Sequence, residues 1–111
     1  MTPRFAAIIT LIAGLLMTGG AFAQQPASVN VAVKNHRFQP AEISAPAQVP
    51  IVLTVKNLDS TPMEFESVSL RVEKVVVGHG TGIIRLRPLA PGRYNFFDDF
   101  HQSANGVLVV R

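Results

Sequence analysis

His101 follows Asp98 by three residues, and this pairing of an imidazole with a carboxylate is the strongest chemical signal in the chain. Two more carboxylates, those of Glu64 and Glu66, come directly after the thioether of Met63 in an earlier segment. An imidazole with several carboxylates is a donor set that suits copper(II), iron, zinc or manganese. These five residues are therefore candidate ligands of one metal ion.

Each candidate also has a purely structural interpretation. Asp98 is of a type that hydrogen-bonds its own backbone in turns, and a histidine in a loop is often simply solvated. The two glutamates alternate as on the solvent face of a strand, where Lys or Arg could balance their repulsion as well as a metal. Met63 is a residue type that fills gaps in a core. The remaining histidines, His36 and His79, are predicted to be surface residues.

Several classes of function are not supported by the sequence. It contains no Gly-x-Ser-x-Gly, no His-Glu-x-x-His and no phosphate loop. Ser103, His101 and Asp98 lie too close in sequence to form a nucleophilic triad. No exposed aromatics interleave with the basic cluster, so nucleic-acid binding is not expected; that cluster is Arg85, Arg87 and Arg93.

Residues 1–23 have the pattern of a secretory signal peptide. One positive charge precedes an apolar run of 13 residues, Phe5 to Met17, which is short against the roughly 20 residues that span a bilayer. Thr18-Gly19-Gly20 breaks the run, and Ala21-Phe22-Ala23 fits a small-x-small cleavage site. We therefore expect a signal-peptide helix, cleavage after Ala23, and export into a bacterial periplasm.

Residues 24–111 are enough for one domain, and a monomer is expected. They carry nine Lys and Arg against seven Asp and Glu, so the net charge is small. The absence of cysteine rules out a disulfide, and a bound metal would then add stability as well as function.

Short β-prone segments recur about every ten residues, without a convincing helical period. A helical turn around Ser69 to Lys74 is one alternative, and Leu89-Ala90-Pro91-Gly92 is typical of a type II turn. The pattern predicts an all-β, Greek-key β-sandwich or barrel of seven to eight strands. The expected strands cover residues 29–38, 42–45, 51–56, 63–70, 71–77, 83–86, 94–97 and 106–110.

Four motifs, spread over residues 29–110, resemble the cupredoxin-like family. The first is Asn35-His36-Arg37-Phe38-Gln39-Pro40, and the second is Asn57 followed by Thr61-Pro62-Met63-Glu64-Phe65-Glu66. The third is Pro88-Leu89-Ala90-Pro91-Gly92-x-Tyr94-x-Phe96. The fourth is Asp98-x-x-His101 with Asn105-Gly106-Val107, which resembles the family's ligand loop and final strand.

Glu64-Phe65-Glu66, with Glu73-Lys74 after it, is similar to one branch of this family. That branch is the small domain associated with periplasmic iron uptake, which occurs fused in EfeO-type proteins or alone beside a ferrous-iron permease. The resemblance implies a protein that binds copper and/or iron and assists ferrous-iron uptake, by oxidising iron or handing it over. Its implied partners are a periplasmic iron-binding protein and an inner-membrane permease.

The ligand positions depart from a blue-copper centre, which needs two histidines, a cysteine thiolate and a weak axial methionine. By the resemblance, Asp98 takes the cysteine position, Met63 or Glu64 the first histidine, and Asn105 lies near the axial methionine. His101 alone is retained. Oxygen ligands favour iron(III), the harder ion, so a ferroxidase-like accessory activity is the expectation. The alternatives are a copper carrier or tolerance protein using Met63 and His101, and a metal-free interaction module.

Overall fold

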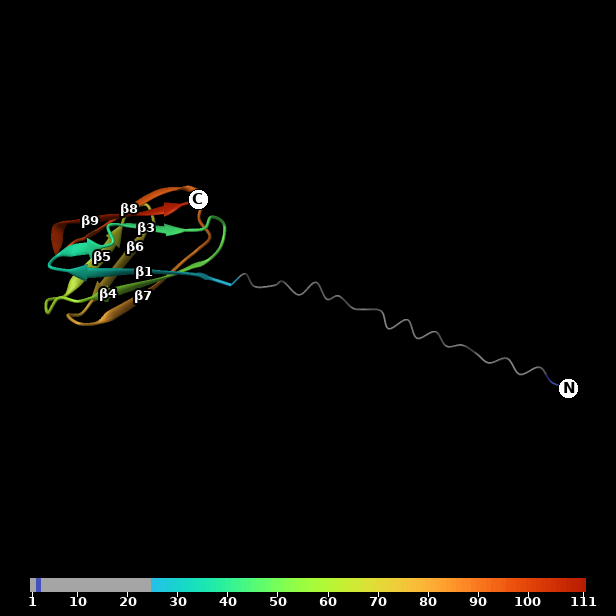
Figure 1. The fold of residues 1–111 in the computed structure, drawn as a ribbon, viewed down its shortest axis with the longest axis horizontal. Coiled ribbons are helices and arrows are strands. Elements are labelled where there is room, and N and C mark those ends of the chain that lie inside the picture. The colour runs from blue at the N-terminus through green and yellow to red at the C-terminus, as the bar shows by residue number, and fades with distance from the viewer. Residues whose placement is uncertain (1, 3–24) are drawn as a thin grey trace.

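Residue 2 and residues 25–111 are described in the computed structural model, and the predicted signal peptide lies, apart from residue 2, outside them. The described chain forms nine strands (Figure 1). Within that part, no helix is long and apolar enough to cross a membrane. The strands are β1 (Ala27–Lys34), β2 (Arg37–Gln39), β3 (Glu42–Ala45), β4 (Ile51–Asn57), β5 (Met63–Ser67), β6 (Val72–Val76), β7 (Thr81–Leu86), β8 (Gly92–Asp98) and β9 (His101–Val110).

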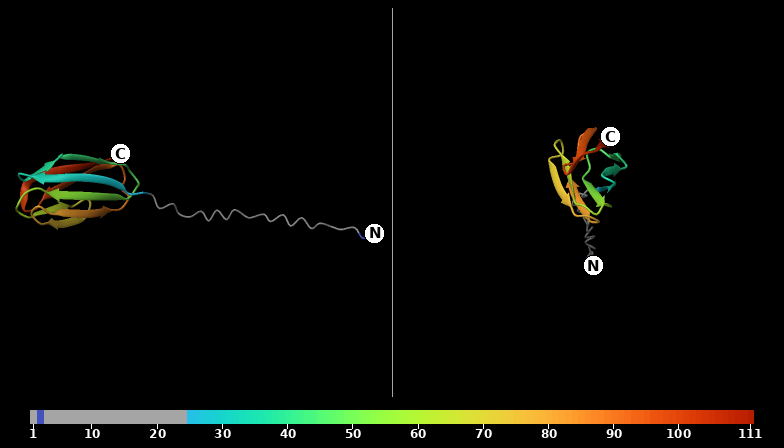
Figure 2. Two further views of the ribbon diagram at one scale, coloured as in Figure 1. Left: turned by 60° about the horizontal axis from the view of Figure 1, so that its bottom comes forward. Right: turned by 90° about the vertical axis from the view of Figure 1, so that its left-hand side faces the viewer.

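The strands pack as two sheets (Figure 2). One sheet has the order β2-β1-β4-β7, and the other has the order β3-β9-β8-β5-β6. Most neighbours are antiparallel, but β1 pairs with β4 and β3 with β9 in parallel. Neighbours that are not consecutive in sequence require crossovers between the sheets. The predicted all-β sandwich is therefore confirmed.

The core lies between the sheets because alternate residues of most strands point inward. At its centre are three phenylalanine rings, from β2, β5 and β8. Phe65 stacks on Phe96 with ring centroids 4.8 Å apart, and Phe38 meets Phe96 edge-on at the same distance. Each such pair contributes about 0.5–1.5 kcal/mol beyond the area it buries. The first predicted motif thus supplies a core anchor, Phe38.

The predicted strand 29–38 is divided in two, which is why nine strands form where seven to eight were expected. Asn35 and His36 have φ of 52° and 56°, and two successive positive φ values are the signature of a tight hairpin turn. The carboxylate of Asp59 accepts the N–H groups of both residues, at 2.7 and 2.9 Å. The turn escaped prediction because it lacks the glycine that usually marks such a position.

Asn57 holds the loop that presents Asp59. The side chain of Asn57 is fully buried at the end of β4. Its Nδ2 donates to the carbonyls of Thr61, Val76 and Val77 at 2.8, 3.2 and 3.2 Å, and its Oδ1 accepts the N–H of Asp59 at 3.1 Å. A buried amide with its groups satisfied fixes the loop in one arrangement.

Three further expectations are corrected. Residues 68–71 form a turn without a helix, and Arg71, at φ 55°, leads into β6. The type II turn at residues 89–92 is wrong, because no described glycine has a positive φ and Gly92 already begins β8. The last strand begins at His101, five residues before the predicted start at Gly106.

Candidate metal centre

Asp98 and His101 face each other across a tight hairpin. They end β8 and begin β9 as register partners, with the two-residue turn Asp99-Phe100 between them. The predicted ligand loop is therefore a hairpin end, and His101 lies in a strand. The Nδ1 of His101 is 3.0 Å from the Oδ2 of Asp98, so the structure brings these two candidates together.

Every oxygen of Asp98 already has a protein partner. The side chain is 0% exposed, and its Oδ1 accepts the N–H groups of Glu64 and Phe100, each at 3.0 Å. The hydrogen bond from the N–H of Phe100, two residues on, is the kind by which an aspartate stabilises its own turn, as the structural interpretation of Asp98 proposed. Asp98 thus ties β5, the β8–β9 turn and the imidazole of His101 together, and a metal ion would have to displace one of these donors.

His36 packs against His101, a contact that the sequence did not predict. The ring centroids are 3.8 Å apart and the planes are inclined by 21°. The Nδ1 of His36 is 3.6 Å from the Oδ2 of Asp59. His36 lies at the surface as predicted, with 47% of its side chain exposed. When Nδ1 faces a carboxylate, Nε2 is the nitrogen left for a metal or other partner.

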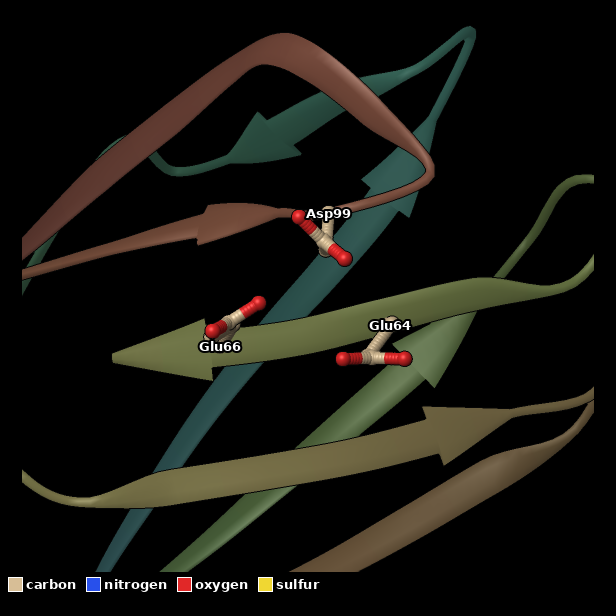
Figure 3. A group of neighbouring side chains, drawn as sticks. All are labelled: Glu64, Glu66 and Asp99. Carbon is tan, nitrogen blue, oxygen red and sulfur yellow. The ribbon is translucent and has the colours of Figure 1, made fainter. Parts of the chain in front are cut away.

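Glu64 and Glu66 form a separate group with Asp99, on the outer face of the sheet (Figure 3). Each of the three offers a carboxylate oxygen, and these oxygens lie within 4.8 Å of one another. The two glutamates alternate along β5 with the buried Phe65, so they share the outer face. The N–H of Asp99 donates to the Glu64 carbonyl at 2.9 Å, which places the turn over β5. We refer to Glu64, Glu66 and Asp99 as the carboxylate triad.

The predicted ligands therefore do not surround one ion. Asp98 pairs with Phe65 across the strands and shares its burial, whereas the next residue, Asp99, joins the triad outside. The structure groups Glu64 and Glu66 with Asp99 and not with Asp98, because consecutive residues leave a strand on opposite faces.

The triad is a site of electrostatic repulsion. Desolvation, followed by the negative charges of Asp99 and Glu73, raises the pKa of Glu64 and of Glu66 above the ordinary glutamate value. Glu73 lies opposite Glu66 on β6 and adds a fourth carboxylate nearby. Among the described residues, no Lys or Arg forms an ion pair with the triad. A bound cation would relieve this repulsion.

Met63 and Asn105 offer little to a metal in this arrangement. The side chain of Met63 is 1% exposed and belongs to the hydrophobic core, as its structural interpretation proposed. Asn105 is exposed, and its Nδ2 donates to the carbonyls of Gln102 and Ser103 at 3.3 and 3.1 Å. Its neighbour Ala104 is the residue that is buried, and it carries no donor atom.

The residues do not fit a blue-copper centre. The chain has no cysteine, and a thiolate is the ligand that defines such a site. The carboxylate that stands in its place is saturated with hydrogen bonds, one of them to the retained histidine. The triad, by contrast, is an all-oxygen set of the kind that hard cations prefer.

Comparison with known proteins shows the family. The profile of the Cupredoxin-like domain matches residues 7–110, and the chain belongs to that family. An uncharacterized protein of Rickettsia prowazekii (strain Madrid E) is 42% identical over 83 residues. The match covers 74% of this chain, and the chain spans just under two thirds, 66%, of that protein.

Several solved structures share the fold. A purple cupredoxin from Nitrosopumilus maritimus has a TM-score of 0.57 at 18% identity, covering 77% of this chain and 99% of that one. The metal-binding domain of the Cu(I)-exporting ATPase CopA of Streptococcus pneumoniae has a TM-score of 0.65 at 16% identity, covering 76% and 84%. A Cu(I) form of amicyanin has a TM-score of 0.63 at 16% identity, covering 76% and 82%. At these identities the likeness shows a fold related to copper-binding proteins, and the fold alone.

Proposed function

We propose that this protein is an exported cupredoxin-like domain that binds iron through carboxylate oxygens and assists ferrous-iron uptake. One observation carries the proposal, namely the three carboxylates of Glu64, Glu66 and Asp99 within 4.8 Å of one another. No described Lys or Arg pairs with them, so their charge is available to a cation.

The donor atoms favour iron in its higher oxidation state. Anionic oxygen stabilises iron(III) more than iron(II), since the harder ion gains more from negative oxygen. Iron(II) held by the triad is therefore easier to oxidise. In air, dioxygen accepts the electrons, takes up protons from water and is reduced. The triad supplies charge and position, and it contributes no electron of its own.

The compartment and the partners follow from two other observations. The signal-peptide pattern of residues 1–23 supports export to the periplasm. The Glu64-Phe65-Glu66 segment supports membership of the iron-uptake branch. In this proposal a periplasmic iron-binding protein receives the iron, and an inner-membrane permease carries it inward.

Metal titration of the purified protein tests the proposal. Iron(II) without oxygen, and iron(III), are titrated into the wild type and into the triple variant Glu64→Gln, Glu66→Gln, Asp99→Asn. We expect the triple variant to lose iron binding, and its rate of aerobic iron(II) loss to fall to that of buffer.

Glu42→Gln is the matched control, because Glu42 is an exposed glutamate on β3 that faces Arg93. This variant should bind iron as the wild type does. Iron binding that survives in the triple variant would exclude the triad. Displacement of iron by equal calcium or magnesium would show that the site does not select iron.

A copper-binding role is the second candidate, since two imidazoles lie stacked at the end of the sandwich and two of the structural relatives bind Cu(I). Copper(II) would bind at the Nε2 of His101, whose Nδ1 faces Asp98, with the ring of His36 stacked beside it. His101→Ala should then abolish copper binding, and His79→Ala should not. A copper(I) affinity far above any iron affinity would favour a carrier role.

The third possibility, a metal-free interaction module, predicts no thermal shift with any metal. A metal at 100 times its dissociation constant stabilises the fold by about 2.7 kcal/mol. Melting curves with iron, copper and no metal therefore distinguish the three roles.

A further inference from the structure

A cleft of about 570 Å³ is lined in part by His36, and neither Asp59 nor any residue of the carboxylate triad lines it. It is bounded by the β1–β2 turn, by β2 and by the first part of β9. Its volume is within the range of about 300–1,000 Å³ that is typical of small-molecule sites.

The polar part of the lining is cationic or neutral. The polar residues that line it are Asn35, His36, Arg37, Ser103 and Asn105, and no acidic residue lines it. Within residues 25–111, Arg37 has neither an ion pair nor a side-chain hydrogen bond. Lys34 is its cross-strand partner, which brings a second positive charge to the same hairpin.

His36 is held in place at the rim of the cleft. Its ring stacks on His101 at 3.8 Å, and its Nδ1 and N–H both face Asp59. The Asp59 carboxylate is thereby committed to the turn. The imidazole edge at the cleft is pre-positioned, and pre-positioned polar groups bind ligands with less loss of side-chain entropy.

The lining also has apolar residues. Ala41 is exposed, and Phe38 and Ala104, which belong to the buried core, reach the cleft only at their edges. An inorganic anion makes no use of such residues, whereas the carbon skeleton of an organic acid packs against them.

We propose that this cleft binds a small organic acid carrying two or three carboxylate groups. The planar guanidinium of Arg37 donates to one carboxylate in a two-point contact, and the Ser103 hydroxyl and the His36 imidazole donate to the others. The carbon skeleton lies against Ala41 and the exposed edge of Phe38. This inference goes beyond the proposed iron binding, because the ligand is an anion and needs no metal.

Calorimetric titration of metal-free protein with citrate tests the proposal, with inorganic phosphate and glycerol as comparison ligands. Citrate should bind, phosphate should bind at least about tenfold more weakly, and glycerol should not bind. Arg37→Gln should weaken citrate binding by about tenfold or more, since a charged hydrogen bond is worth about 1.5–3 kcal/mol and each 1.4 kcal/mol is tenfold. Ser103→Ala should weaken it by about fivefold.

Arg85→Gln is the matched control. Arg85 is an exposed arginine on β7. β7 and β2 are the two edge strands of the same sheet, so Arg85 lies at the far edge from Arg37. Arg85→Gln removes one positive charge from the same sheet but none from the cleft, so citrate binding should be unchanged. Equal losses in Arg37→Gln and Arg85→Gln would reduce the effect to general charge and overturn the proposal. Phosphate binding as tight as citrate binding, or no citrate binding, would overturn it too.

The two sites are tested separately. Arg37→Gln should leave iron binding by the triad intact, and the triple triad variant should leave citrate binding intact. Amide spectra of each variant, compared with the wild type, confirm that the sandwich is folded. Citrate-induced shifts in the wild type should be confined to residues 35–41 and 103–105.

Discussion

The imidazoles of His36 and His101 lie face to face, 3.8 Å apart, and the Nδ1 of each faces an aspartate. This contact joins the β1–β2 turn of one sheet to the β8–β9 hairpin of the other. It also connects the two candidate sites. Asp98, which holds His101, accepts the N–H of Glu64 in the triad, and His36 lines the cleft. One line of contacts therefore crosses the end of the sandwich.

Replacing Asp98 should destabilise the protein strongly. Asp98→Ala removes the acceptor of two backbone N–H groups and of the His101 imidazole. Loss of one partner in a buried network leaves the other groups without hydrogen bonds, so we expect the free energy of unfolding to fall by about 3 kcal/mol. Urea unfolding measures it. Asp99→Ala, in the same turn but outside the core, is the control and should change stability by less than about 0.5 kcal/mol.

Removing a charge from the triad should have opposite effects on stability and on binding. The pKa of Glu66 is raised, so its ionised form is disfavoured in the folded state, and the wild type gains stability as the pH falls through that raised pKa. Glu66→Gln should therefore raise the melting temperature of the metal-free protein at pH 7 while it weakens iron binding. Scanning calorimetry and iron titration on one preparation measure both. A lowered melting temperature at pH 7 would contradict the assigned repulsion.

Asp59 should make the fold sensitive to acid. The His36 N–H donor, with that of Asn35, holds the pKa of Asp59 below its ordinary value of about 3.9. The stabilisation from Asp59 is fully present above that ordinary value and is lost as the pH falls through the lower, folded-state pKa. Asp59→Asn should thus flatten the pH dependence of unfolding below about pH 4. Denaturant midpoints from pH 2 to pH 7 measure this, and parallel curves for variant and wild type would refute it.

Gly106 should tolerate no side chain. A Cβ there would lie 2.3 Å from the Phe96 ring and 2.9 Å from the Ala41 carbonyl oxygen. Forcing a methyl group into a packed core costs about 1–3 kcal/mol, and Gly106→Ala should lower stability by that amount. Gly92→Ala is the comparison, because its nearest neighbour is 3.6 Å away, in the Tyr94 ring, and stability should hardly change. Equal effects of the two substitutions would argue against this packing.

The alternation of apolar and polar residues was sufficient to predict the class of fold and most strands. It succeeded because one face of each strand must be buried, which places Val29, Val31 and Val33 on one side. It failed at Asn35-His36, where a turn without glycine is stabilised by Asp59, 24 residues away from Asn35. A bond at that separation leaves no local pattern.

The sequence by itself determined the kinds of atom available. It has carboxylates and imidazoles but no thiolate, so blue-copper chemistry is excluded whatever the fold. It also paired Asp98 with His101 through their spacing of three residues and the resemblance to a ligand loop. Tertiary structure alone decided which side chains meet. A two-residue turn sends Asp98 into the core and Asp99 out to Glu64 and Glu66, and sheet packing brings His36 onto His101. These contacts depend on the register between strands that are far apart in the sequence, and no local sequence pattern specifies that register.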